Sequence, residues 1–157
     1  MCGYGGVSLS KIKYLFIVGM ALLAGCAGAP TQEMSDARQA VSAAHDVGAA
    51  EHARENVQHA EALLNKAEHE FKRGDFGGAR DDAEAARVEA IKAQDIAQVM
   101  SATKRALQQA TARGVLSGEA TQLFEQAITA ADDQKVHEAI RLANEARHQA
   151  EQDLNLQ

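Results

Sequence analysis

The chain has 157 residues and a formal net charge of −6, with 46% hydrophobic but only 4% aromatic residues. The negative charge argues against nucleic acid as a partner, and the scarcity of aromatic side chains argues against stacking platforms for bases or sugars. Alanine is the most frequent residue and proline occurs once, a composition that favours helices over a β-sandwich or barrel.

Residues 1–25 have the pattern of a signal peptide. Lys11 and Lys13 precede an apolar run from Tyr14 to Leu23, which is too short to span a bilayer and fits the apolar region of a secretory signal. We therefore expect this segment to be removed. An ordinary secretory signal is one interpretation, and the residues that follow the run favour a more specific one.

Four residues at the end of this segment, Leu23, Ala24, Gly25 and Cys26, resemble the lipobox of bacterial lipoproteins. The resemblance implies cleavage before Cys26 and acylation of its thiol and of its new amino group. Ala27, rather than Asp, follows the cysteine, which by resemblance to Gram-negative sorting signals implies the outer membrane. Residues 26–35 are then the acylated cysteine and a short tether. With Cys2 removed, no free thiol is left for a disulfide or a metal site.

Residues 36–157 are expected to form one helical hairpin domain. Glycines divide this part of the chain, and between them the apolar residues recur at helical spacing. The pattern predicts helices near residues 34–47, 51–73, 76–113, 118–131 and 135–154. The third contains a heptad seam made of alanine, which consists of Ala79, Ala83, Ala86, Ala90, Ala93 and Ala97.

Sliding the chain against itself by 60 residues reveals an internal repeat. It pairs Ala60, Leu63, Ala67, Ala79, Ala83, Ala86, Arg87 and Ala90 with Ala120, Leu123, Ala127, Ala139, Ala143, Ala146, Arg147 and Ala150. Each unit is predicted to be a helical hairpin, with its turn at Gly74–Asp75 or at Gln134–Lys135. The predicted fold is therefore all-α, an antiparallel helical bundle of repeat-like hairpins.

The turn and seam around Phe71, Gly74, Asp75 and Phe76 resemble the turn between the two helices of a tetratricopeptide repeat. The period differs, so we do not expect a superhelix with a peptide groove. The stretch 30–110 resembles a family of unknown function found in short Gram-negative outer-membrane lipoproteins. The motifs that carry this resemblance are Pro30, Ser35-Asp36-Ala37-Arg38, Val47-Gly48-Ala49-Ala50, Ala60-Glu61-x-Leu63-x-x-Ala67 and Gly74-Asp75-Phe76-x-x-Ala79.

No catalytic constellation is visible, and neither an enzyme activity nor a cofactor is expected. His45, His52 and His59 would share one face if the helix ran unbroken through Gly48, but two turns separate each pair, whereas metal ligands on a helix come three or four residues apart. We therefore predict no metal site. The pair Asp132-Asp133 and Ser117 are interpreted as turn and capping residues.

These patterns predict a lipid-anchored outer-membrane lipoprotein that faces the periplasm and acts as a protein-interaction or adaptor module. Its expected partners are the membrane, through Cys26, and either another envelope protein or a second copy of itself. No small-molecule substrate is evident. A structural envelope spacer or oligomer is the alternative, and a metal-binding lipoprotein is a less favoured one.

Overall fold

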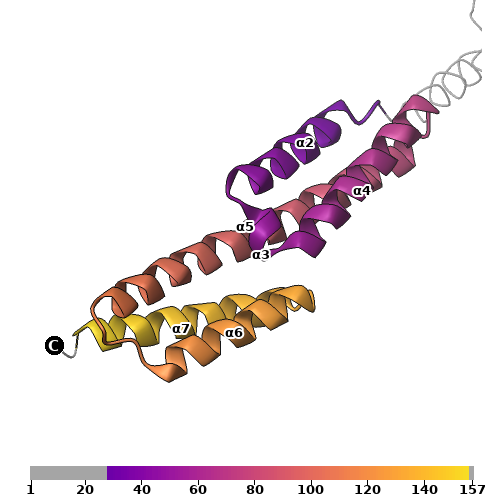
Figure 1. Cartoon of the computed structure of the whole chain (residues 1–157). Coiled ribbons are helices and arrows are strands. Elements are labelled where there is room, and N and C mark those ends of the chain that lie inside the picture. The colour runs from indigo at the N-terminus through magenta and orange to yellow at the C-terminus, as the bar shows by residue number, and fades with distance from the viewer. Residues whose placement is uncertain (1–27, 156–157) are drawn as a thin grey trace, which may run out of the picture.

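The computed structural model describes residues 28–155, within which six helices and no strand occur. The helices are α2 (Thr31–Asp46), α3 (Ala49–His52), α4 (Arg54–Lys72), α5 (Phe76–Ala112), α6 (Gly118–Asp132) and α7 (Val136–Asn155) (Figure 1). The all-α bundle predicted from the sequence is thus confirmed. The predicted signal peptide, the lipobox and Cys26 lie outside the described residues. Between residues 28 and 155, every helix is too short or too polar to cross a bilayer.

The long helix α5 organises the molecule. Its 37 residues span about 55 Å at 1.5 Å per residue. The first half of α5 packs against α2 and α4, whereas the second half packs against α7 (Figure 1). Helix α6 packs mainly against α7. One hydrophobic cluster runs through both halves and includes Val41, Val57, Ile96, Ala130 and Leu142. Each of the six described helices therefore contributes to this central cluster.

The alanine seam predicted for α5 is completely buried between the helices. All six of its alanines have no exposed surface. Small side chains let neighbouring helix backbones approach closely, so a chain with few large apolar residues can still exclude water between its helices. The seam continues towards the end of α5 with larger buried side chains, including Met100 and Leu107.

The 60-residue repeat describes two equivalent hairpins, α4 with the first half of α5, and α6 with α7. At the turns, the backbone N–H groups of Gly74 and Gln134 each donate to a carbonyl three residues back, at 3.0 Å in both cases. Both residues have positive φ, +80° and +59°. Gln134 therefore adopts a backbone conformation for which glycine is better suited.

A second offset, of 66 residues, extends the repeat to a third helix. It pairs four buried residues of α2 with four buried residues in the second half of α5, and it also pairs Gly48 with Gly114, which have φ of +72° and +73°. The buried pairs are Met34 with Met100, Ala37 with Thr103, Val41 with Leu107, and Ala44 with Ala110. The molecule thus consists of two three-helix units, and α5 is the last helix of the first unit and the first helix of the second.

The two offsets differ by six residues because the first unit has an additional segment after Gly48, where the short helix α3 lies. A single helix over 51–73 was expected from the sequence, but the helix is interrupted at Ala53, whose φ of −146° is not helical. Ala53 is buried, with 3% of its surface exposed, so packing rather than residue type holds this interruption in place.

The predicted tether is too long. Helix α2 begins at Thr31, five residues before the expected start of the folded domain at residue 36. Pro30 and Met34 are buried, and Met34 packs in a cluster with Ala67 and Ala83. Residues 31–35 are therefore not part of a tether, because contacts with α4 and α5 make them part of the bundle.

Ser117 caps the start of a helix as predicted, whereas Asp132 and Asp133 lie at a helix end and in the turn that follows it. The Ser117 hydroxyl accepts a hydrogen bond from the Ala120 N–H at 3.3 Å, as expected for an N-cap. Asp132 and Asp133 instead lie at the end of α6, where the Asp133 carboxylate accepts a hydrogen bond from Lys135 at 3.0 Å. Asp75 caps α5 by accepting from the Gly78 N–H at 3.1 Å.

Candidate interaction surfaces

The three histidines spaced seven residues apart do not form a stripe along one helix. His45 lies on α2, His52 on α3 and His59 on α4, because the chain leaves the helical path at Gly48 and again at Ala53. His45 makes a 2.7 Å contact with the Glu61 carboxylate. Burial lowers the pKa of His52, and Lys104 adds to that effect while Glu51 opposes it. Within residues 28–155, no group of three histidines or carboxylates is arranged to hold a metal ion.

An open groove lies on the hairpin α6–α7, with a volume of about 520 Å³. Its walls come from both helices and from the turn between them, and they carry both signs of charge. The lining residues are Gln122, Glu125, Gln126, Thr129, Ala130, Asp133, Lys135, Glu138, Arg141 and Leu142. Such a surface offers hydrogen-bond donors and acceptors in a shallow groove.

The equivalent place on the hairpin α4–α5 carries different residues. Under the 60-residue offset, Glu70 is equivalent to Ala130 of the groove, and Asp82 is equivalent to Leu142. Glu70 is buried with only 8% of its surface exposed, and the Asp82 carboxylate lies 2.9 Å from Lys66 Nζ. A Cβ atom on Gly78 would come within 2.9 Å of Glu70 Oε2. Glycine at position 78 therefore makes room for the Glu70 carboxyl group.

The buried Glu70 carboxyl group lies in an acidic environment. Burial raises the pKa of Glu70, and the neighbouring carboxyls of Asp82 and Asp75 raise it further, whereas Lys66 lowers it. Glu70 Oε2 has no hydrogen-bond partner. The groove of the second unit, which has alanine at this position, contains no such group.

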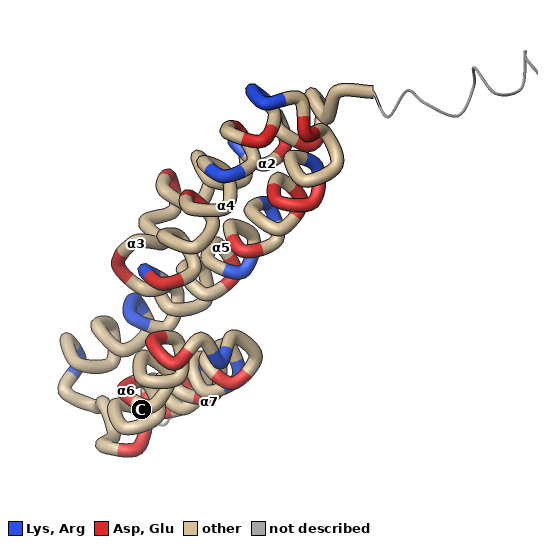
Figure 2. The backbone as a smooth tube through the Cα atoms, turned by 90° about the vertical axis from the view of Figure 1, so that its right-hand side faces the viewer, with Lys and Arg blue, Asp and Glu red and all other residues tan. Residues whose placement is uncertain are grey.

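Two smaller hollows flank the exposed face of α5 around Val88, which is 45% exposed. One, of about 440 Å³, lies towards α4 and includes His59 and Leu63. The other, of about 380 Å³, lies towards α2 and includes Glu33 and Arg87. Lys, Arg, Asp and Glu are interspersed along the backbone tube in Figure 2. The hollow towards α4 is lined by acidic residues and no Lys or Arg, whereas the one towards α2 has both signs of charge.

The tip of the second hairpin comes close to the middle of α5. Lys92 and residues 134–138 line a hollow of about 420 Å³ between them. Lys92 donates to Glu89 at 2.6 Å, and the buried Asn56 donates to the same carboxylate at 3.0 Å. Burial alone would raise the pKa of Glu89, but these two hydrogen bonds outweigh it and lower the pKa.

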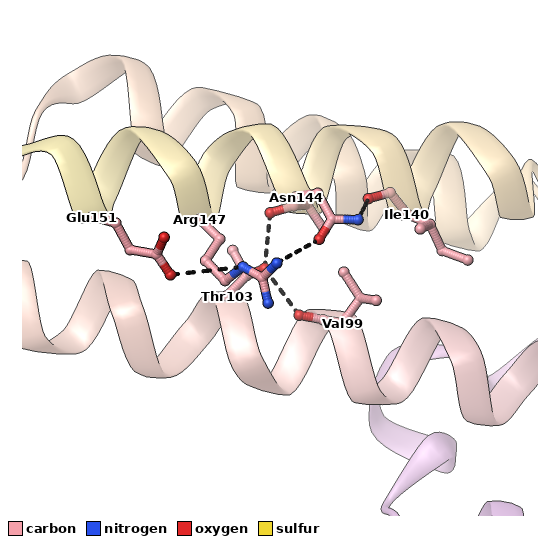
Figure 3. A network of polar contacts seen from close by, with 7 residues as sticks. Val99, Thr103, Ile140, Asn144, Arg147 and Glu151 are labelled. Carbon is pink, nitrogen blue, oxygen red and sulfur yellow. Dashed lines mark hydrogen bonds and ion pairs between the residues drawn. The ribbon is translucent and has the colours of Figure 1, made fainter.

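A buried polar contact joins α5 to α7 in the second unit. The hydroxyl oxygen of the fully buried Thr103 lies 2.9 Å from the carbonyl oxygen of Val99 on α5 and 2.8 Å from that of Ala143 on α7 (Figure 3). Beside it, Arg147 donates to the Asn144 side chain at 3.0 Å. Of these contacts, the one between Thr103 and Ala143 joins α5 to α7.

The start of the described chain is fixed to α5. The Arg80 guanidinium donates to the Gly28 carbonyl oxygen at 2.9 Å and forms an ion pair with Glu33 at 2.7 Å. The hydrogen bond from Arg80 lowers the pKa of Glu33. The segment before α2 is therefore held at one end of α5, next to the turn between α4 and α5 (Figure 1).

Comparison with known proteins gives one family match. Residues 32–113 match the family described as Domain of unknown function (DUF4398), and these residues include nearly all of α2 and all of α3 to α5. No curated protein and no solved structure matches the chain. The matched stretch covers just over half of the 157 residues. The chain therefore belongs to the DUF4398 family.

Proposed function

We propose that this protein is a lipid-anchored outer-membrane lipoprotein, facing the periplasm, whose helical body acts as a protein-interaction module. The anchor is inferred from the pattern Leu23-Ala24-Gly25-Cys26 after a signal-like segment, and the membrane from Ala27. The several acyl chains implied for Cys26 would hold the protein stably in a bilayer. No reaction is proposed.

The open groove on α6–α7 is the observation that supports binding most directly. The two equivalent hairpins differ at this place, because the first has the acidic residues Glu70 and Asp82 where the second has Ala130 and Leu142. The open groove presents Gln, Glu, Thr, Lys and Arg side chains, which suit a polar helix or an extended segment of another protein. We propose this groove as the contact site for an envelope protein.

Site-specific photo-crosslinking in cells tests this proposal. Thr129 lies in the groove, and the equivalent residue of the first hairpin under the 60-residue offset is His69; both are exposed. A photoreactive residue at position 129 is expected to capture one recurrent envelope protein, and one at position 69 is not. Equal capture at both positions, or capture at neither, would contradict the groove as the binding site.

A structural spacer is the second candidate. Helix α5 spans about 55 Å and has buried residues from Ala79 to Ala110, which suits a protein that keeps two structures apart. Crosslinks from position 129 that join only copies of this chain would favour this spacer or oligomer over the adaptor.

A further inference from the structure

The predicted anchor lies very close to the folded body. Cys26 and Gly28 are two residues apart, and two residues of fully extended chain span at most about 7 Å. Gly28 is already bound through its carbonyl oxygen to Arg80, Pro30 is buried, and α2 begins at Thr31. A body attached in this way has no long linker with which to move away from the membrane.

The same contacts determine which end of the body is near the anchor. Arg80 lies in the second turn of α5, and its ion pair with Glu33 holds the beginning of α2 beside that turn. The turn between α4 and α5 is therefore at the anchored end, whereas the turn between α5 and α6 and the end of α7 lie at the opposite end (Figure 1). The 37 residues of α5 separate the two turns by about 55 Å.

The anchored end carries exposed cations beside the exposed carboxylates of Asp75 and Asp81. Lys72 and Arg73 are exposed at the end of α4. Of the other cations at this end, Arg38 pairs with Glu68, Lys66 with Asp82 and Arg80 with Glu33. Among the ion pairs within residues 28–155, none involves Lys72 or Arg73.

Two aromatic rings flank these cations. Phe71 and Phe76 are half-buried on either side of the turn, with their ring centroids 5.5 Å apart. Aromatic side chains beside lysine and arginine are typical of segments at the level of lipid headgroups, where the rings meet the apolar boundary and the cations meet phosphates.

We propose that the turn between α4 and α5 rests on the phospholipid surface, with Lys72 and Arg73 in contact with lipid phosphates and Phe71 and Phe76 at headgroup level. This inference rests on the proposed lipid anchor and adds an orientation. The body projects from the membrane by the length of α5, and the open groove of α6–α7 lies in the membrane-distal unit.

Two glycines provide matched reporter positions for a test. Gly77 lies in the first turn of α5 at the anchored end, and Gly118 lies in the first turn of α6 at the far end. Both are exposed, and a Cβ atom would meet nothing closer than 3.9 Å at Gly77 and nothing within 4 Å at Gly118. Gly77→Cys and Gly118→Cys can therefore each carry a fluorophore without disturbing the core.

The full mature protein, purified with its lipid, is placed in phosphatidylglycerol and phosphatidylethanolamine vesicles that contain a headgroup nitroxide quencher. We expect several-fold stronger quenching from position 77 than from position 118. The double substitution Lys72→Gln and Arg73→Gln should weaken the quenching at position 77. The control, the double substitution Lys104→Gln and Arg105→Gln, changes an adjacent pair of exposed cations in the second half of α5 and should leave the quenching at position 77 unchanged.

The outcomes separate this inference from the anchor on which it rests. Equal quenching at the two positions, or stronger quenching at position 118, in protein that floats with the vesicles would overturn the orientation and leave the anchor in place. Quenching at position 77 that is unaffected by the Lys72 and Arg73 changes would overturn the phosphate contact. Protein that does not float with the vesicles would overturn the proposed anchor together with this inference.

Discussion

Two buried polar side chains show how single residues shape this helical body. Glu70 places a carboxyl group over Gly78, where the backbone of α5 has no side chain to exclude it. Thr103 occupies a core position that Ala37 occupies in the first unit, and its hydroxyl reaches a carbonyl oxygen of α7. Both side chains are buried, so each carries a polar group into a position that an apolar residue could occupy without needing a hydrogen-bond partner.

Glu70→Gln is expected to stabilise the protein at neutral pH. The pKa of Glu70 is raised in the folded state by burial and by Asp82 and Asp75, against the opposing charge of Lys66. Folded protein therefore binds this proton more tightly than unfolded protein does, so ionisation lowers stability as the pH rises through and above the ordinary glutamate pKa of about 4.3. Glutamine keeps the shape of the side chain and cannot ionise.

Urea unfolding at several pH values checks this prediction. The gain from Glu70→Gln should be present at pH 7 and should disappear as the pH falls below about 4. The exposed Glu84, changed to Gln, is the control and should show little change at either pH. A Glu70→Gln protein that is less stable than the original at pH 7 would show that the ionised carboxylate stabilises the fold.

Thr103→Val tests the hydrogen bond between α5 and α7. Valine keeps the volume and removes the hydroxyl, so we expect a loss of about 0.5–1.5 kcal/mol in the free energy of unfolding. Thr111 is a matched control on the same helix, since its hydroxyl donates to the Leu107 carbonyl oxygen at 2.8 Å but the residue is exposed. Losses of equal size in Thr103→Val and Thr111→Val would mean that the contact with α7 contributes nothing.

At the scale of the helices, small side chains decide how the elements meet. Ala83 is fully buried in a cluster with Met34, Ala37 and Ala67, and the equivalent Ala143 is fully buried in the second unit. The seam carries no large side chain that could change rotamer to make room. Packing along α5 is therefore sensitive to added volume.

Ala83→Leu is expected to lower the free energy of unfolding by about 1–3 kcal/mol, because the added atoms overfill the interface between helices. Chemical denaturation measures the effect, and Ala143→Leu should behave in the same way. Ala62→Leu, at an exposed position within α4, should change stability little, since both residues are good helix formers. An unchanged midpoint for Ala83→Leu would mean that the seam tolerates a larger side chain.

The sequence predicts most of the helices, because glycine positions and helical spacing are local signals. The turns at Gly74 and Gly114 and the seam from Ala79 to Ala97 follow from such signals. The interruption at Ala53 does not, because alanine favours helix and only packing explains the break. The start of α2 at Thr31 depends likewise on contacts of Met34 with residues distant in sequence.

The surfaces were less predictable than the helices. The 60-residue repeat is visible in the sequence. The sequence does not reveal the groove on α6–α7, nor that Glu70, which is equivalent to Ala130, is buried. The contact of Arg80 with Gly28 joins residues 52 positions apart, and no periodic pattern marks it. The 66-residue offset was available in the sequence, with Gly48 and Gly114 as its clearest signal.

At the scale of the whole molecule, the two fused three-helix units form one elongated body with different ends. One end holds the beginning of the described chain beside the turn between α4 and α5, and the other carries the turn between α5 and α6 (Figure 1). In the proposed arrangement the first end lies at the membrane, and the second unit presents its open groove to partners. The shared helix α5 would keep the groove at a set distance from the bilayer.

The anchor at Cys26 is the claim on which this arrangement depends, and mass spectrometry of the mature protein tests it most directly. We predict an N-terminus at Cys26 that carries acyl chains, and a Cys26→Ser protein that remains an unprocessed precursor and takes up no labelled fatty acid. A mature protein that begins at another residue, or equal lipid labelling of Cys26→Ser and the original protein, would contradict it.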